Sequence, residues 1–273
     1  MKSDRGGRII TTVGSALIDL GAESAALDDV VVELTAAGWR TASAAPGWSI
    51  AHQIAHLAWT DDLASTAILN PQAFRLFAAG ATAKSDTLAD ETASAAVEQK
   101  PAAQLLRDWR RGREKLAVAL ASAAPDARIP WFGPSMATLT MVTARIMETW
   151  AHGQDILDGL GLDQTPTARL RHIAHIGVKT RDFSYRTHGG TPPEHHFRVE
   201  LIGPGGESWV WGPADAEQCV AGNALDFCLL VTQRRHRDDV NVVATGPDAN
   251  NWLNIAQAFA GPPGAGRKPA KLR

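Results

Sequence analysis

The chain has 273 residues, of which 45% are hydrophobic and 21% are charged, a balance typical of a folded globular protein. The formal net charge of −2 excludes a global basic field that would draw the protein to nucleic acid or to an anionic membrane. Cys219 and Cys228 form no CxxC pair and no Cys–His metal spacing, so we expect both to be small buried apolar residues.

The first predicted helix runs from about residue 9 to 38, where apolar residues recur at helical spacing and Gly38 suits a C-terminal cap. The segment TASAAPGWS that follows is small, polar and proline-containing, which predicts a loop. Ser49 is placed to cap a second helix, which we expect to run to about Leu69 before the NPQ segment ends it.

A more polar helix is expected over 88–98, and Pro101 is expected to open the next one, through about residue 121. After the loop IPWFGPS, Ser135 can cap a long helix that ends at the GLG segment, and a further helix is expected over 166–186. Four or five amphipathic helices with short connections indicate an antiparallel bundle.

Beyond about residue 190 the pattern changes from helical to mixed. HHFRVELIG and SWVWG alternate apolar and polar residues around a PGG turn, which predicts a hairpin. ALDFCLLVTQ and NNWLNIAQAFA indicate two helices, and DVNVVATG indicates a strand between them. We therefore expect two domains, a helical one over 1–188 and a smaller α/β one over 189–273.

The N-terminal segment lacks the apolar run of a signal peptide, and no stretch approaches the roughly 18 uninterrupted apolar residues of a membrane span. These two observations predict a cytoplasmic protein. We expect its partners to be small-molecule substrates, with no nucleic acid and no membrane among them, and we expect a monomer or a homodimer.

Two helical segments carry residues that can bind a metal. SIAHQIAHLAW contains His52 and His56, and RIMETWAHGQD contains Glu148 and His152. Residues four apart lie on one face of a helix, so Glu148 and His152 can point at one spot, and a histidine of the other helix can supply a third ligand. Three protein ligands leave coordination positions open, as in catalytic metal sites.

The default interpretation of an ExxxH pair is a solvated pair of side chains on the surface of a helix. Here apolar side chains such as Met147 and Trp150 flank the pair, which argues against exposure. A carboxylate buried without a partner is costly, so a compensating cation is the natural inference. The spacing by itself leaves the surface pair and the metal site both open.

The stretches APGWSIAHQIAHLAWTDDLA and RIMETWAHGQDILDGLG resemble the two signature segments of the DinB-like metal-binding superfamily, in its branch with mycothiol-dependent maleylpyruvate isomerase. The resemblance implies an α+β fold, with an N-terminal DinB-like four-helix bundle followed by a smaller C-terminal α/β, sterol-carrier-like domain. It also implies that His56, Glu148 and His152 hold one divalent metal, for which zinc is our first choice, and that mycothiol is a co-substrate.

Three further residues near these motifs are candidates for a catalytic role. His52 is either a polar residue at the mouth of the site or a proton shuttle. Asp155 could orient His152 through a hydrogen bond, and Arg145 could hold an anionic group of the substrate or form an ion pair.

A basic cluster in the C-terminal part, QRRHR, contains Arg234 and Arg235. A solvated turn is the default interpretation of such a cluster. If this domain closes over the metal cleft, either arginine could bind a carboxylate on the substrate or on a thiol cofactor.

The resemblance implies a metal-dependent enzyme that activates a small thiol, or water, for attack on an electrophilic small molecule, as a transferase or isomerase. Two alternatives stay open. One is a lyase, hydrolase or cyclase of secondary metabolism that uses the metal without a thiol. The other is a non-catalytic protein that binds a small ligand.

Overall fold

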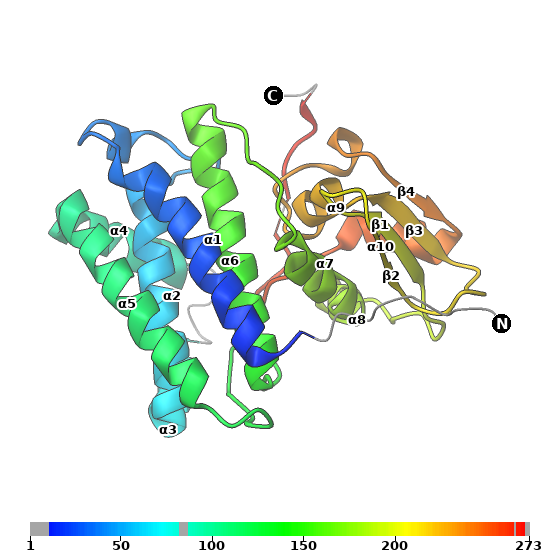
Figure 1. The fold of residues 1–273 in the computed structure, drawn as a ribbon, viewed down its shortest axis with the longest axis horizontal. Coiled ribbons are helices and arrows are strands. Elements are labelled where there is room, and N and C mark those ends of the chain that lie inside the picture. The colour runs from blue at the N-terminus through cyan, green and yellow to red at the C-terminus, as the bar shows by residue number, and fades with distance from the viewer. Residues whose placement is uncertain (1–10, 82–86, 265, 271–273) are drawn as a thin grey trace.

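The computed structural model describes residues 11–81, 87–264 and 266–270 and has an α+β fold. Four long helices lie side by side, with α1 and α2 each packed against both α5 and α6 (Figure 1). This arrangement is the predicted four-helix bundle. Its members are α1 (Val13–Val32), α2 (Ile50–Leu69), α5 (Ala102–Ser122) and α6 (Thr138–Leu160).

Helix α1 is shorter than predicted at its C-terminal end. It begins after Thr12, whose hydroxyl accepts a hydrogen bond from the Ser15 N–H at 3.1 Å, and its C-cap is Glu33. Gly38 instead opens a short 3₁₀ turn, Gly38–Arg40. The predicted start at residue 9 lies outside the described residues.

The NPQ segment ends α2 as predicted, and a further helix, which was not predicted, begins there. Helix α3 (Pro71–Ala81) starts with Pro71 at its first position, where the absent N–H removes no helical hydrogen bond. Asn70 caps it, because its side-chain oxygen accepts a hydrogen bond from the Ala73 N–H at 3.1 Å. Helix α4 (Leu88–Gln99) matches the expected polar helix and packs on α2.

Helix α6 starts two residues later than a Ser135 cap would place it, since Ala137 is the residue at its N-cap. Its predicted C-terminal end is confirmed, because Gly161 has a φ of 66° in the left-handed region. Gly159 brings this end of α6 against the loop before α2, since a Cβ there would lie 2.5 Å from the Ala42 carbonyl oxygen. The loop and α6 therefore meet with no side chain between them.

The helix expected over 166–186 is two helices, α7 (Leu170–Lys179) and α8 (Arg181–Thr187). The break falls at Thr180, whose hydroxyl donates to the Ile176 carbonyl oxygen at 3.0 Å. Helix α7 packs against α6 on the side of the bundle that faces the sheet (Figure 1).

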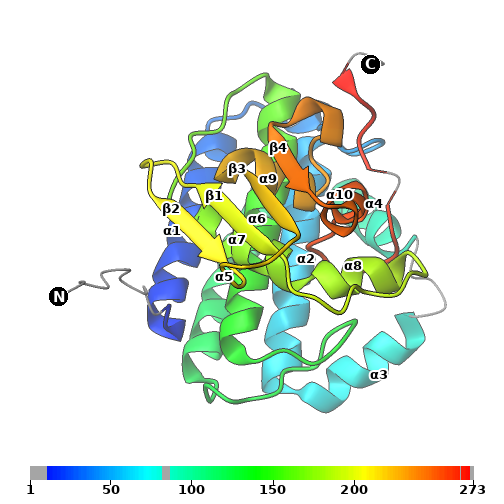
Figure 2. The same cartoon turned by 90° about the vertical axis from the view of Figure 1, so that its right-hand side faces the viewer.

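The sheet has the order β2-β1-β3-β4, and α9 and α10 pack against its strands (Figure 2). The predicted β1–β2 hairpin is confirmed, with Leu201 opposite Trp209. Strand β3 was not predicted, yet it is central and pairs parallel to β1 and antiparallel to β4. The elements are β1 (Arg198–Ile202), β2 (Ser208–Trp211), β3 (Cys219–Asn223), α9 (Ala224–Val231), β4 (Val242–Thr245) and α10 (Pro247–Ile255).

One apolar core extends from the bundle into the sheet. Helices α7 and α9 make the junction, where Gly177 has no Cβ and the Val231 side chain fills the space. Cys228 is buried in this core as expected, whereas Cys219 is partly exposed. The boundary near residue 188 stays a prediction. Among the described helices, none is long and apolar enough to cross a membrane.

Candidate metal centre

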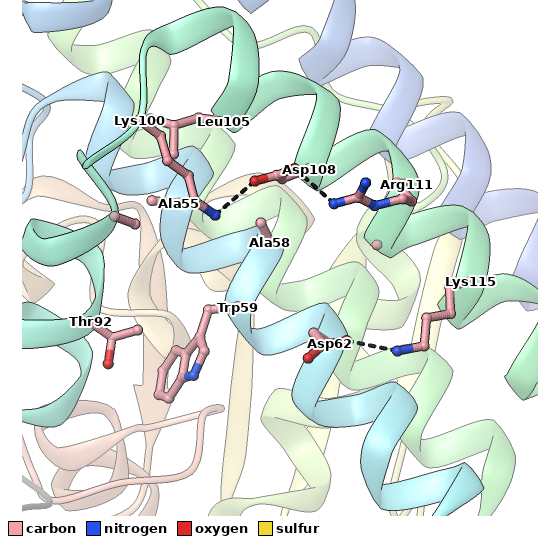
Figure 3. A pocket seen from close by; sticks show the side chains of 12 residues that line it. Ala55, Ala58, Trp59, Asp62, Thr92, Lys100, Leu105, Asp108, Arg111 and Lys115 are labelled. Carbon is pink, nitrogen blue, oxygen red and sulfur yellow. Dashed lines mark hydrogen bonds and ion pairs between the residues drawn. The ribbon is translucent and has the colours of Figure 1, made fainter. Parts of the chain in front are cut away.

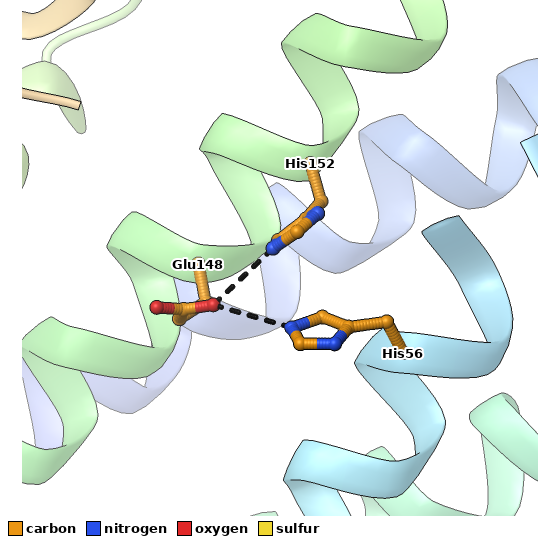
Figure 4. Close-up of side chains that lie close together, drawn as sticks. All are labelled: His56, Glu148 and His152. Atoms are coloured by element: carbon orange, nitrogen blue, oxygen red, sulfur yellow. Dashed lines mark ion pairs between the residues drawn. The ribbon is translucent and has the colours of Figure 1, made fainter. Parts of the chain in front are cut away.

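His56, Glu148 and His152 lie together inside the bundle. His56 reaches from α2 towards Glu148 and His152, which are one turn apart on α6 (Figure 4). Glu148 Oε2 lies 3.4 Å from His152 Nε2 and 3.8 Å from His56 Nε2. One ligand atom from each residue falls within 4.8 Å of the other two. Two ligands on one zinc ion lie about 3.4 Å apart in tetrahedral geometry, so the observed spacing suits a single ion.

The orientation of His152 is fixed by Gln53, which was not among the predicted site residues. Gln53 is fully buried, and its Oε1 lies 2.6 Å from His152 Nδ1. Its Nε2 donates to Ser43 Oγ at 2.8 Å, so Oε1 is the acceptor and His152 carries its proton on Nδ1. The Nε2 lone pair of His152 therefore faces the carboxylate of Glu148. Two lone pairs at this distance repel unless a cation lies between them, so the residues fit a bound metal.

Replacing Gln53 by leucine is expected to weaken metal affinity about 10–100-fold, because His152 loses the acceptor that sets its tautomer. Metal affinity would be measured by competition with a chromogenic chelator. Gln154→Leu is the matched control, since Gln154 is also a buried glutamine but bonds to Asp158 instead. Equal metal affinity in the two variants would show that Gln53 does not position His152.

The charge states of the site are those that a metal requires. Burial and the neighbouring His56 lower the pKa of His152 to about 4, so its ring is neutral at pH 7. Burial alone would raise the pKa of Glu148, but the groups around it, the Arg145 guanidinium among them, hold the pKa well below its ordinary value. A carboxylate beside a neutral imidazole is therefore available without loss of a proton on metal binding.

Two tryptophans enclose the histidines. The Trp48 ring lies 5.3 Å from the His56 ring and 6.1 Å from the His152 ring, centre to centre. Trp48 is held in place because its indole N–H donates to Asp90 Oδ1 at 2.7 Å. The Trp59 ring lies 5.8 Å from the His56 ring, centre to centre. These contacts restrict the imidazoles and limit access of water to them.

The three residues line a cavity of about 610 Å³ between the bundle and the C-terminal part of the chain. Its walls come from α2, α6 and α8, from the facing ends of α3 and α4, from the loop around Trp131, and from Arg234 and the segment 259–262. A cavity of this volume accommodates a small molecule beside the metal ligands.

His52 is engaged as a capping residue of α2. Its Nδ1 accepts a hydrogen bond from the Ser49 N–H at 3.2 Å and lies 2.8 Å from Ser49 Oγ. The neutral ring then carries its proton on Nε2. The predicted cap at Ser49 is confirmed, and His52 is not among the residues that line the cavity. This placement favours the structural interpretation of His52 over a proton shuttle.

Arg145 lies inside the bundle, with 2% of its side chain exposed. Its guanidinium donates to Asp61 Oδ1 at 3.0 Å and to Thr60 Oγ1 at 2.9 Å, both on α2. Arg145 does not line the cavity, so of its two predicted roles the geometry supports the ion pair and gives no support to an anion contact.

The hydrogen bond that orients His152 comes from Gln53, whereas the carboxylate of Asp155 is engaged by arginines. Its carboxylate accepts from Arg234 at 2.9 Å and pairs with Arg267.

Arg235 binds both carboxylate oxygens of Asp158, at 2.6 and 2.7 Å. The basic cluster thus fastens the C-terminal part of the chain to α6, and only Arg234 of the two predicted arginines lines the cavity.

A second hollow, of about 450 Å³, lies between α2, α4 and α5 (Figure 3). Its charged groups are already paired: Lys100 and Arg111 bind Asp108, and Lys115 binds Asp62. Because each cation has an acid of the same surface, this hollow is a solvated ion-pair face, and it does not contain the metal-ligand cluster.

Residues 20–157, just over half of the chain, match the family described as mycothiol maleylpyruvate isomerase N-terminal domain. The chain belongs to this family. The matched span contains His56, Glu148 and His152, and the resemblance stated from the two signature segments is confirmed. Residues 193–245 match a second family, described as wyosine base formation.

The uncharacterized protein Rv0036c of Mycobacterium tuberculosis (strain ATCC 25618 / H37Rv) is 49% identical over 254 residues, which cover 93% of this chain and 98% of that protein. The crystal structure of the mycothiol-dependent maleylpyruvate isomerase matches with a TM-score of 0.55 at 17% identity, covering 87% of this chain and 96% of that one. A histidine-to-alanine variant of that isomerase matches with the same TM-score at 15% identity. These structures share the α+β fold of this family member.

Proposed function

We propose that this protein is a metal-dependent enzyme that activates a small thiol for attack on an electrophilic small molecule, as a transferase or an isomerase. The observation that carries the proposal is the convergence of His56, Glu148 and His152 on one spot at the wall of a small-molecule cavity. Membership of a family named for a mycothiol-dependent isomerase supports mycothiol as the thiol.

The donor set favours zinc. Two imidazole nitrogens and one carboxylate oxygen form a mixed set of three protein ligands, which leaves a coordination position open. A bound zinc ion would supply Lewis acidity, which lowers the pKa of a thiol or water molecule that reaches the open position.

The chain's own residues would bind and orient. Gln53 holds the Nε2 of His152 towards the shared spot, and Trp48 packs against the histidine rings. The thiol would enter through the cavity, whose lining is mostly apolar. Since Nδ1 of His52 is engaged by Ser49, we assign release of the thiol proton to water.

The test is thiol binding at a cobalt-substituted centre. Mycothiol is expected to produce a sulfur-to-cobalt charge-transfer band in the wild type, whereas its alcohol analogue, with oxygen in place of sulfur, produces none. Glu148→Ala is expected to lose at least about 100-fold in metal affinity and with it the band. Loss of free thiol is then followed with a panel of small electrophiles. A metal-loaded protein that shows neither the band nor thiol loss would refute thiol activation.

A further inference from the structure

The cavity beside the metal ligands has a wall of aromatic side chains that the proposed chemistry does not use. Trp131 and Phe132 come from the loop between α5 and α6, Phe183 comes from α8, and Phe259 comes from the C-terminal segment. Each of these rings keeps part of its surface accessible. Aromatic side chains that line a cavity favour a flat apolar group, because stacking adds to the gain from burial.

The wall is formed before any ligand enters. The Trp131 ring stacks on the buried Phe74, with ring centres 5.4 Å apart and an angle of 7° between the planes. The backbone around Phe259 is tied down by Gln257, whose side-chain amide donates to the Phe259 and Gly261 carbonyl oxygens at 3.0 and 3.1 Å. A stacked Trp131 ring and a fixed backbone at Phe259 reduce the conformational entropy that a ligand would have to cost this wall.

The cationic side chain of the cavity wall is already engaged in hydrogen bonds, and the wall also holds the Glu148 carboxylate. Among the described residues, Arg234 is the one cationic side chain in the lining. Its three nitrogens donate to the carbonyl oxygens of Ala151 and Thr232 and to the carboxylate of Asp155, at 3.1, 2.7 and 2.9 Å. A carboxylate that leaves water for this wall would have to compete with Asp155 for the guanidinium, and burying it without a partner is costly.

We propose that the cavity selects an uncharged substrate with a flat apolar ring, which lies against Trp131, Phe183 and Phe259, and that it disfavours a carboxylate-bearing substrate. This inference names the substrate class and so rests on the proposed function for its place in the reaction. The selectivity itself is a property of the aromatic wall and of Arg234, and it is measurable without the metal.

The test uses three probes and isothermal titration calorimetry on the full-length protein, as purified and after treatment with a chelator. The probes are 1-naphthylacetamide, 1-naphthylacetate and fumarate. In chelated protein the amide is expected to bind at least about tenfold more tightly than the acid, and fumarate is expected not to bind. Removal of the metal ensures that a carboxylate gains nothing by coordination. The same titrations on chelated Glu148→Gln, which lacks the carboxylate of the lining, are expected to keep the preference for the amide. Equal or tighter binding of the acid or of fumarate would overturn the proposal.

Alanine variants of the cavity rings test whether naphthylacetamide binds at the aromatic wall. Phe259→Ala and Phe183→Ala are each expected to weaken naphthylacetamide binding about tenfold, the size of one aromatic contact. Leu76→Ala removes an apolar side chain that is 72% exposed and outside the cavity, and it is expected to change nothing. Circular dichroism identifies a variant that fails to fold, and the other ring variant then decides. Discrimination between amide and acid in a protein that binds no metal would refute the metal chemistry but support this inference. A protein that binds metal and activates the thiol but does not discriminate between amide and acid would support the proposed function and refute this inference.

Discussion

Replacing His56 by alanine is expected to abolish stoichiometric binding of a divalent metal. The wild type is expected to hold about one ion per chain, because three ligand atoms converge within 4.8 Å. Without His56, only Glu148 and His152 remain, both on α6. Loss of an outer hydrogen-bond partner already costs about 10–100-fold in metal affinity, so loss of a ligand should cost at least about 100-fold. Metal content by mass spectrometry and competition titration measure the effect.

His52→Ala is the matched control for this experiment. His52 lies one turn before His56 on the same helix, and its ring caps α2 instead of joining the cluster. This variant is expected to keep the metal and to lose about 1 kcal/mol of stability, the usual contribution of a helix cap. Equal metal content in both alanine variants, or no metal in carefully handled wild type, would refute a metal site formed by His56, Glu148 and His152.

The metal-ligand cluster is the part of the site that the sequence predicts well. The four-residue spacing of Glu148 and His152 places both on one face of a helix, and the resemblance adds His56 from a second helix. Gln53 was missed although it lies three residues before His56, on the same side of α2. A glutamine carries no spacing signature of its own, and only the crossing of α2 and α6 shows that it reaches His152.

The roles of the charged residues were harder to predict for the same reason. Asp61 lies 84 residues from Arg145, and Arg234 lies 79 residues from Asp155. Long separations of this kind leave no local pattern, so an arginine that pairs inside the protein has the same sequence context as one that binds a substrate. Burial and partners, which only the structure supplies, separate the two.

The missed elements of the fold are those in which local signals point two ways. The NPQ segment ends α2 and also starts α3, because proline is unfavourable within a helix but suits its first position. Strand β3 contains Gly222, and its sequence CVAGN does not alternate apolar and polar residues, which hides it from a search for alternation. Its central place depends on pairing with β1 and β4, and a Cβ at Gly222 would lie 2.7 Å from the Asn241 carbonyl oxygen.

Replacing Asp61 by asparagine is expected to destabilise the fold by about 3–5 kcal/mol, the usual cost of removing one partner of a buried ion pair. Asp61 and Arg145 have side chains that are 5% and 2% exposed, and they lie 2.9 Å apart between α2 and α6. Asparagine keeps an oxygen that can accept from Arg145 but carries no charge, so the guanidinium stays buried without its counter-ion on α2. Urea denaturation of chelated protein measures the effect without a contribution from metal binding.

Asp62→Asn tests whether burial is the cause, because the adjacent acid also forms an ion pair. Asp62 is paired with Lys115 at 2.8 Å, but its side chain is 63% exposed. Solvent screens such a pair, so this variant should lose no more than about 1 kcal/mol. A similar loss in the two variants would mean that the Asp61–Arg145 pair contributes no more than a surface pair. Arg145 would then be free to move, and its interpretation as a substrate contact would regain support over the internal ion pair.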